Sequence, residues 1–319
     1  MNKKVEFTPH IIAISALFVL GNGILSLPEK GADGFTFLAF LVSLPLVFLI
    51  FWLSSIIFGK ISETKSSSGG LKKAVYIICL ISAGIFALFS GAATFKALTE
   101  FVSAVMLPET PMFFIVAVLL VAVIYFFIQK EKSILKFGLI SGVLTATAVV
   151  FFFVSAADRY DLRNIFIFRL PSFRELIFQL KPYLINPVLQ VAVLPVFLKG
   201  VLRENKLKSG FFGVLVGGIF LGLGILSSVL LFSPEIAGVL QFPFSSAVST
   251  VTVGRLFTRL DGFAYFVYFV CGLSKITVCV FSVRWILREL SIIIRNRKYT
   301  DCVRFSGFNK KIKNIKKSS

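Results

Sequence analysis

The chain contains 319 residues, of which 57% are hydrophobic and 38 are phenylalanine, and its mean hydropathy is +0.91. A soluble domain of this length carries more charge and less aromatic bulk, so the composition excludes an ordinary soluble protein. The net charge of +19 would suit nucleic-acid binding, but the Lys and Arg residues lie mostly in alternate loops and in the C-terminal tail, as membrane topology requires. We therefore expect a polytopic membrane protein that binds no nucleic acid.

Apolar runs of about 20 residues recur along the chain, and each is long enough to cross a hydrocarbon core of about 30 Å. The first run begins near Ile11 and has no small-residue cleavage site, so it does not resemble a cleaved signal peptide. The expected membrane domain is residues 1–298, and residues 299–319 form a basic cytoplasmic tail. The predicted fold is all-α with eight spans, at about 9–33 (interrupted), 35–58, 73–107, 111–129, 135–157, 175–199, 210–233 and 262–294.

The loops between these spans predict the orientation. With the N-terminus inside, most of the 34 Lys and Arg residues fall on the inner side, which places both termini in the cytoplasm. Several arginines between spans five and six are an exception, partly offset by Asp158, Asp161 and Glu175. The outer segment 233–261 is too apolar for a free loop, so we expect short helices that lie over the outer mouth.

The first span contains the sequence GNGILSLPEKG at residues 21–31. Gly21 and Gly23 permit unusual backbone dihedrals, and Asn22 can hydrogen-bond locally or to a ligand. An unwound backbone in a membrane is tolerated where it lines a protected cavity or coordinates a ligand. The alternative is that these glycines allow close packing between helices.

A second interruption is predicted in the sixth span, KPYLINPVLQVAVLP, where Asn186 and Pro187 lie mid-span and Pro195 follows. Breaks in the first and sixth spans are typical of inverted-repeat transporters, whose substrate site lies between the two breaks. The pair of breaks therefore favours a central binding site over a local packing kink.

Charged residues within the spans give further candidates. Lys275 lies near the middle of the last span, where a lone charge costs at least about 2.5–3.5 kcal/mol, so it should face a cavity or a partner. It is either a proton-binding lysine or an ammonium that donates to the carbonyls of an unwound segment. Lys96 and Glu100 are four residues apart on one helical face, so they either neutralise each other or serve as a gate or subunit contact.

Two other residue types argue against enzyme chemistry. His10 is the only histidine, so no His-based metal site or catalytic triad is available. The cysteines show no close metal-ligand spacing, and most lie in apolar segments, which indicates small core residues: Cys79, Cys271, Cys279 and Cys302. We expect no catalytic residue, no metal site and no cofactor.

Several stretches resemble a known family, in the same order along the chain. They are GNGILSLP, ALTEFVSAVMLPETP, QFPFSSA and GRLFTRLDGFAYFVYFVCGLSK. The first resembles the opening motif of the amino acid/polyamine/organocation transporter superfamily. Together they are similar to the spore germination permeases, the B subunits of bacterial spore germinant receptors, over nearly the whole chain.

This resemblance implies a LeuT-type inverted-repeat fold and a role in sensing nutrients, such as amino acids, in the inner membrane of dormant spores, together with an A and a C subunit. The family usually has ten spans, so the last two would be absent here. By the same resemblance, the ligand would meet the backbone of Gly21, Asn22, Gly23 and Ile24, facing Asn186 and Pro187. Lys275 would stand in for the cation of sodium-coupled relatives.

Three hypotheses follow. The first is a germinant-binding sensor that biases its partner subunits and contacts membrane lipid. The second is a proton-coupled amino acid permease with Lys275 as the proton site. The third is a non-transporting scaffold subunit with a degenerate site.

Overall fold

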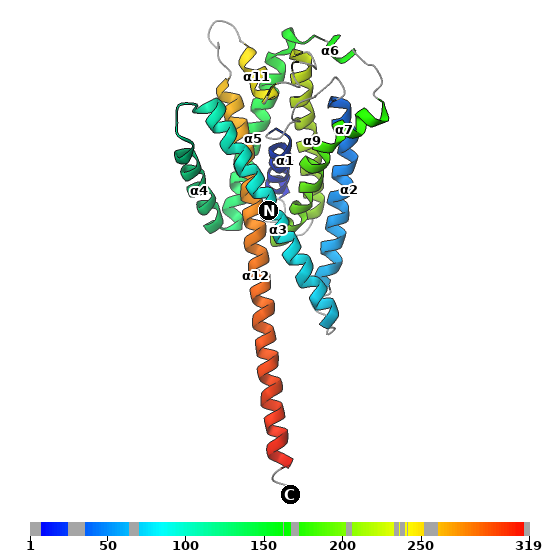
Figure 1. Ribbon diagram of the computed structural model, residues 1–319, viewed down its shortest axis with the longest axis vertical. Coiled ribbons are helices and arrows are strands. Elements are labelled where there is room, and N and C mark those ends of the chain that lie inside the picture. The colour runs from blue at the N-terminus through cyan, green and yellow to red at the C-terminus, as the bar shows by residue number, and fades with distance from the viewer. Residues whose placement is uncertain are drawn as a thin grey trace, which may run out of the picture.

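The computed structural model describes residues 8–24, 36–63, 70–161, 163–166, 172–201, 206–232, 242–251 and 261–315, together with residues 236 and 240. The described elements are all helical and form one bundle (Figure 1). The α-helices are α1 (Thr8–Ile24), α2 (Thr36–Glu63), α3 (Gly70–Phe101), α4 (Met112–Ile128), α5 (Glu131–Ser155), α6 (Arg163–Phe166), α7 (Phe173–Tyr183), α8 (Val193–Gly200), α9 (Lys206–Leu231), α11 (Pro243–Thr250) and α12 (Asp261–Ile315). Short π or 3₁₀ segments are η2 (Val102–Met106), η3 (Ala157–Arg159), η4 (Leu184–Leu189) and η5 (Gln190–Ala192).

Within the described residues, six helical stretches are long and apolar enough to cross a membrane, and each lies on a predicted span. They are Phe37–Gly59, Ala74–Met106, Glu131–Ser155, Leu176–Gly200, Lys206–Leu231 and Asp261–Ile293. Two shorter apolar helices, Pro9–Gly21 and Met112–Ile128, lie on predicted spans one and four. Residues 25–33 of the first predicted span lie outside the described residues. The polytopic membrane architecture is therefore confirmed, and six of the eight predicted spans coincide with described helices that are long enough to cross a membrane.

Helix α1 is the central element of the bundle, and it packs against α5, α9 and α12. Glycines on the neighbouring helices allow the close approach. A Cβ atom at Gly217 of α9 would lie 2.7 Å from the carbonyl oxygen of Ala16, and one at Gly142 of α5 would lie 2.8 Å from the Cβ of Ala13. Each glycine has a second glycine four residues before it, as in the small-residue stripes that join membrane helices.

The sixth predicted span is interrupted as expected. Helix α7 ends at Tyr183, η4 and η5 follow, and α8 resumes at Val193. Asn186 has extended dihedrals (φ −133°, ψ 113°) inside this run, directly before Pro187. Proline disfavours helical geometry at the preceding residue and has no N–H to donate, which explains the position of the break.

The prediction of short helices in the outer segment 233–261 is confirmed for its described part. Helix α11 lies at the upper end of the bundle in Figure 1 and packs on α9 and α12. Phe244, Ala247 and Val248 are buried in that contact. The last helix, α12, begins at Asp261 and continues to Ile315, past the expected domain boundary at residue 298.

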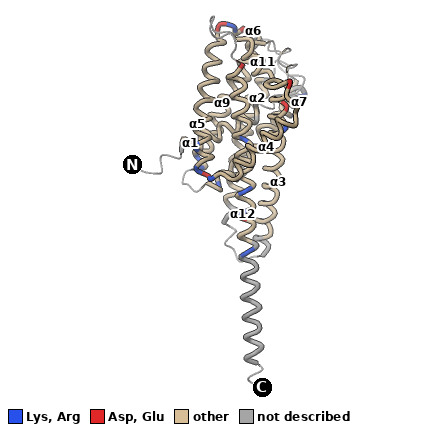
Figure 2. The backbone as a smooth tube through the Cα atoms, turned by 90° about the vertical axis from the view of Figure 1, so that its left-hand side faces the viewer, with Lys and Arg blue, Asp and Glu red and all other residues tan. Residues whose placement is uncertain are grey.

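Several cations within the described residues bind the carbonyl ends of helices. Figure 2 shows the helices free of charged residues along most of their length, with Lys and Arg in short segments. Arg284 of α12 donates from Nη1 to the carbonyl oxygens of Phe127 (2.8 Å) and Gln129 (2.7 Å) at the end of α4. Lys206 donates from Nζ to the carbonyl oxygen of Val201 (2.9 Å), just after α8. These contacts satisfy carbonyl groups that a helix leaves unpaired at its C-terminus.

Candidate binding site at the interrupted helix

A chain of polar side chains runs through the protein interior from the interrupted helix to α3. Gln190 is buried, with 4% of its surface exposed, and its Nε2 donates to Oδ1 of Asn186. Ser90 of α3 donates from Oγ to Oε1 of Gln190 at 3.0 Å. Thr94, one turn further along α3, donates from Oγ1 to the carbonyl oxygen of Ser90 at 2.8 Å. The break is therefore joined to α3 by hydrogen bonds rather than by apolar packing alone.

Lys275 extends this polar region onto α12. Its side chain is only 2% exposed, and a Cβ atom at Gly21 of α1 would lie 3.2 Å from the Cβ of Lys275. Cys279, one turn further along α12, interacts electrostatically with Lys275 and adjoins the hydroxyl of Ser90. No residue that the structure describes accepts a hydrogen bond from the Lys275 ammonium or pairs with it as a carboxylate. The lysine is thus a buried donor in the region where α1, α3 and α12 meet.

The first predicted break, over residues 21–31, can be followed only as far as Ile24, because the rest of it lies outside the described residues. Helix α1 continues without interruption through Gly21, Asn22 and Gly23 and ends at Ile24. Backbone N–H groups this far inside a helix bond to carbonyls of the preceding turn, so they are not free to hold a ligand. The side chains of Asn22 and Ile24 lie outside the part of the chain that the structure describes.

The two glycines lie at close helix contacts, as the alternative interpretation of this motif predicts. A Cβ atom at Gly21 would lie 2.6 Å from the carbonyl oxygen of Cys271 on α12. One at Gly23 would overlap the side chain of Leu221 on α9. At Gly21 the obstacle is backbone, so only glycine permits this approach, which places α1 directly against Lys275; at Gly23 the flexible Leu221 side chain could shift.

Aromatic side chains lie between this region and α11. Phe101 of α3 stacks on Tyr268 of α12 with ring centroids 4.2 Å apart and planes 9° apart. Phe242 packs edge-on against both rings. Tyr268 precedes Lys275 by seven residues, or two helical turns, so this aromatic cluster lies above the lysine on the same face of α12. The described structure is therefore closed on the side of α11.

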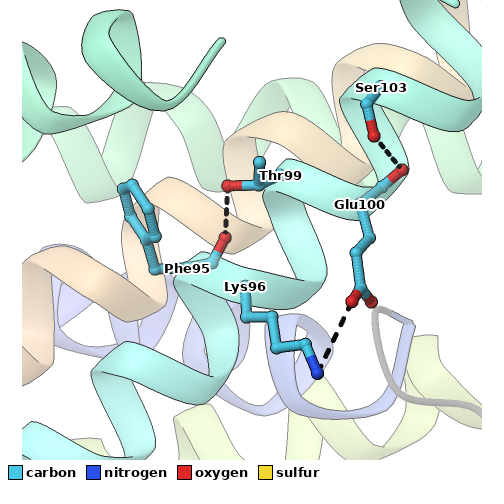
Figure 3. A network of polar contacts seen from close by, with 5 residues as sticks. All are labelled: Phe95, Lys96, Thr99, Glu100 and Ser103. Carbon is cyan, nitrogen blue, oxygen red and sulfur yellow. Dashed lines mark hydrogen bonds and ion pairs between the residues drawn. The ribbon is translucent and has the colours of Figure 1, made fainter. Parts of the chain in front are cut away.

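Lys96 and Glu100 do not join the buried polar chain. Figure 3 shows the Lys96 ammonium pointing to the Glu100 carboxylate, and Nζ and Oε1 are 3.6 Å apart. The two side chains are 77% and 44% exposed, whereas Ser90 and Thr94 on the same helix are buried. The prediction that the pair neutralises itself is confirmed, and its role as a gate or subunit contact stays a prediction.

The sequence did not single out three members of the buried region: Ser90, Gln190 and Cys279. Gln190 follows Asn186 by four residues, a spacing that brings two side chains together on a helix, and this signal could have identified it. Ser90 and Cys279 are ordinary small residues of membrane helices, so their role is visible only from the packing. Among the described residues, no three His, Cys, Asp or Glu side chains lie close enough to hold a metal ion.

Comparison with protein families identifies the chain. A family model described as spore germination protein matches residues 7–303. The chain belongs to the spore germination protein family. The match begins just before α1 and continues into the second half of α12, so it covers the whole bundle and confirms the resemblance seen in the sequence motifs. No curated protein matched the chain in a second comparison. This spore germination protein is an integral membrane protein by the length and composition of its helices.

Proposed function

We propose that the protein is the permease-like subunit of a nutrient germinant receptor, which binds a small germinant, such as an amino acid, within the membrane of the spore. One observation carries the proposal: in a spore germination protein, a helix break and a fully buried lysine border one buried polar region, joined through Gln190, Ser90 and Cys279. Buried polar groups are costly in a membrane protein and are retained where they serve a ligand or an ion.

The proposed architecture is the LeuT-type fold with eight of its usual ten spans and both termini in the cytoplasm. Two contacts support it. The interrupted sixth span packs on α1, and the polar chain joins the break to α3. In LeuT-type proteins the first, third and sixth spans, which correspond to α1, α3 and the interrupted helix here, surround the substrate. The protein acts as a binding subunit rather than as an enzyme, and needs no metal or cofactor.

Germinant binding would act by shifting the population between two states of the bundle. A ligand shifts such an equilibrium only by its difference in affinity for the two states. The closed aromatic cluster of Phe101 and Tyr268 supports an occluded state as one of them. The exposed pair Lys96 and Glu100 would contact the A or C subunit and transmit the change, since an exposed charged pair in a membrane helix favours a protein or aqueous neighbour.

The test is germination of spores that lack this protein, compared with spores in which the wild type or a variant has been restored. Loss of the response to one or more amino acids in the deletion strain, and its recovery with the wild type, is expected. Gln190→Leu should remove the response because it breaks the chain between Asn186 and Ser90, whereas the exposed variant Lys208→Met should keep it. Immunoblots of spore membranes control for abundance. A deletion strain that responds normally to every nutrient contradicts the proposal.

A second function, proton-coupled amino acid uptake, is favoured by Lys275 alone, because a buried lysine without an acceptor among the described residues can bind and release a proton. It predicts uptake of labelled amino acid into vesicles, driven by a pH gradient and abolished by Lys275→Ala. Vesicles that accumulate no solute would exclude this function. If the protein also binds no amino acid, the scaffold hypothesis is the one that stands.

A further inference from the structure

The buried ammonium of Lys275 is on the inner face of the bundle, and it has no counter-ion within the described part of the chain. Its side chain is 2% exposed, and Cys279 is the residue with which it interacts electrostatically. Of the carboxylates that the structure describes, none pairs with it; Glu100 pairs with Lys96 on the opposite, exposed face of α3. A buried charge of this kind is costly unless it is paired and hydrogen-bonded.

The amide and hydroxyl groups of the polar chain from Asn186 to Thr94 are already engaged, whereas the buried hydroxyl of Ser274, next to Lys275, has no hydrogen-bond partner among the described residues. The Gln190 amide donates to Asn186, and its carbonyl accepts from Ser90. Thr94 donates to the backbone of its own helix, and the helical N–H groups at Gly21 and Gly23 bond within α1. Lys275 differs from these groups because it carries a positive charge, and no described residue accepts a hydrogen bond from it.

We propose that Lys275 is the anion anchor of the site, and that the ligand is a small molecule whose carboxylate pairs with its ammonium. This inference rests on the proposed function, because it names the chemical class of the germinant that the subunit binds. It differs from the arrangement that the sequence motif implied, in which the backbone of residues 21–24 would hold the carboxylate. The N–H groups of residues 21–24 belong to the helix, and the Lys275 side chain, packed against Gly21, would supply the donor instead.

The position of the lysine fits this role. Gly21 brings α1 against the Lys275 side chain, the Asn186 break lies against α1, and the aromatic pair Phe101–Tyr268 closes the region on the side of α11. A carboxylate that pairs with Lys275 leaves water for an apolar environment, where a charge-assisted hydrogen bond to an ammonium is stronger than in water. The ion pair would also stabilise the occluded state over an open one.

The experiment compares acids with their amides. The full-length protein is purified in lipid nanodiscs, and its thermal unfolding is followed with the common L-amino acids and with the C-terminal amide of each one. An amino acid that stabilises the wild type should lose about 100-fold or more in affinity as its amide, because the amide has no negative charge. Lys275→Met should show the same loss for the acid, and Lys275→Arg should restore part of the binding.

Lys208→Met is the matched control, since it removes an exposed lysine at the start of α9 and should bind like the wild type. Equal stabilisation by acids and amides, or unchanged binding by Lys275→Met, overturns the inference and leaves the proposed function standing. If no amino acid stabilises the wild type, the proposed function fails and the inference fails with it. A ligand-free Lys275→Met that unfolds cooperatively shows that any lost binding is not a folding defect.

Discussion

Replacement of Lys275 by methionine should stabilise the ligand-free protein, although most core substitutions destabilise. Methionine keeps an unbranched side chain of similar length, so little packing is lost, while the unpaired charge is removed. The lysine is 2% exposed and near the middle of a membrane span, where a lone ammonium costs about 2.5–3.5 kcal/mol by insertion scales. Allowing for imperfect packing of the thioether, we expect the free energy of unfolding to rise by about 2 kcal/mol.

The assay is reversible unfolding in mixed micelles with increasing sodium dodecyl sulfate, followed by tryptophan fluorescence and circular dichroism. Lys208→Met serves as the control, and its free energy of unfolding should stay within about 0.5 kcal/mol of the wild type because this lysine is exposed. A loss of more than about 1 kcal/mol in Lys275→Met would refute the reasoning. That result would mean that the ammonium already has a partner in the folded state, and both the anion anchor and the proton site would need revision.

Three further predictions concern the framework of the site. Gly217→Leu should destabilise the protein by about 1–3 kcal/mol or prevent folding, because the new side chain would push α9 away from α1. Gly59→Leu is the control and should be neutral, because there is open space around Gly59. Thermal unfolding of the two variants tests this difference. Gln190→Leu should lower the free energy of unfolding by about 1–3 kcal/mol in the same assay, because it leaves the buried side chains of Ser90 and Asn186 without their partner. An unchanged unfolding midpoint would show that the polar chain is not formed. Arg284→Met should lower the free energy of unfolding by a similar amount and increase amide hydrogen exchange at the end of α4, because Arg284 caps the carbonyl groups there. Unaltered exchange at the end of α4 would contradict this capping role.

The two predicted helix breaks differ in how strongly the local sequence constrains the backbone. Asn186 and Pro187 are recognisable because proline constrains the backbone locally in any context, and the break occurs there. Gly21 and Gly23 only permit an unusual backbone, so the same residues also suit a straight helix that packs closely. The neighbours decide between these outcomes, and Cys271 and Leu221 lie more than a hundred residues away in the sequence.

Hydropathy, proline geometry and motif order are local properties of the chain, so the membrane class, the positions of the apolar helices, the break in the sixth span and the family are all predictable without a structure. Three other facts depend on tertiary packing: α1 stays helical through Ile24, Ser90 and Gln190 join α3 to the break, and Lys275 has no acceptor among the described residues. Those facts depend on which helix faces meet, and each apolar helix of this protein presents several faces that would suit either lipid or protein.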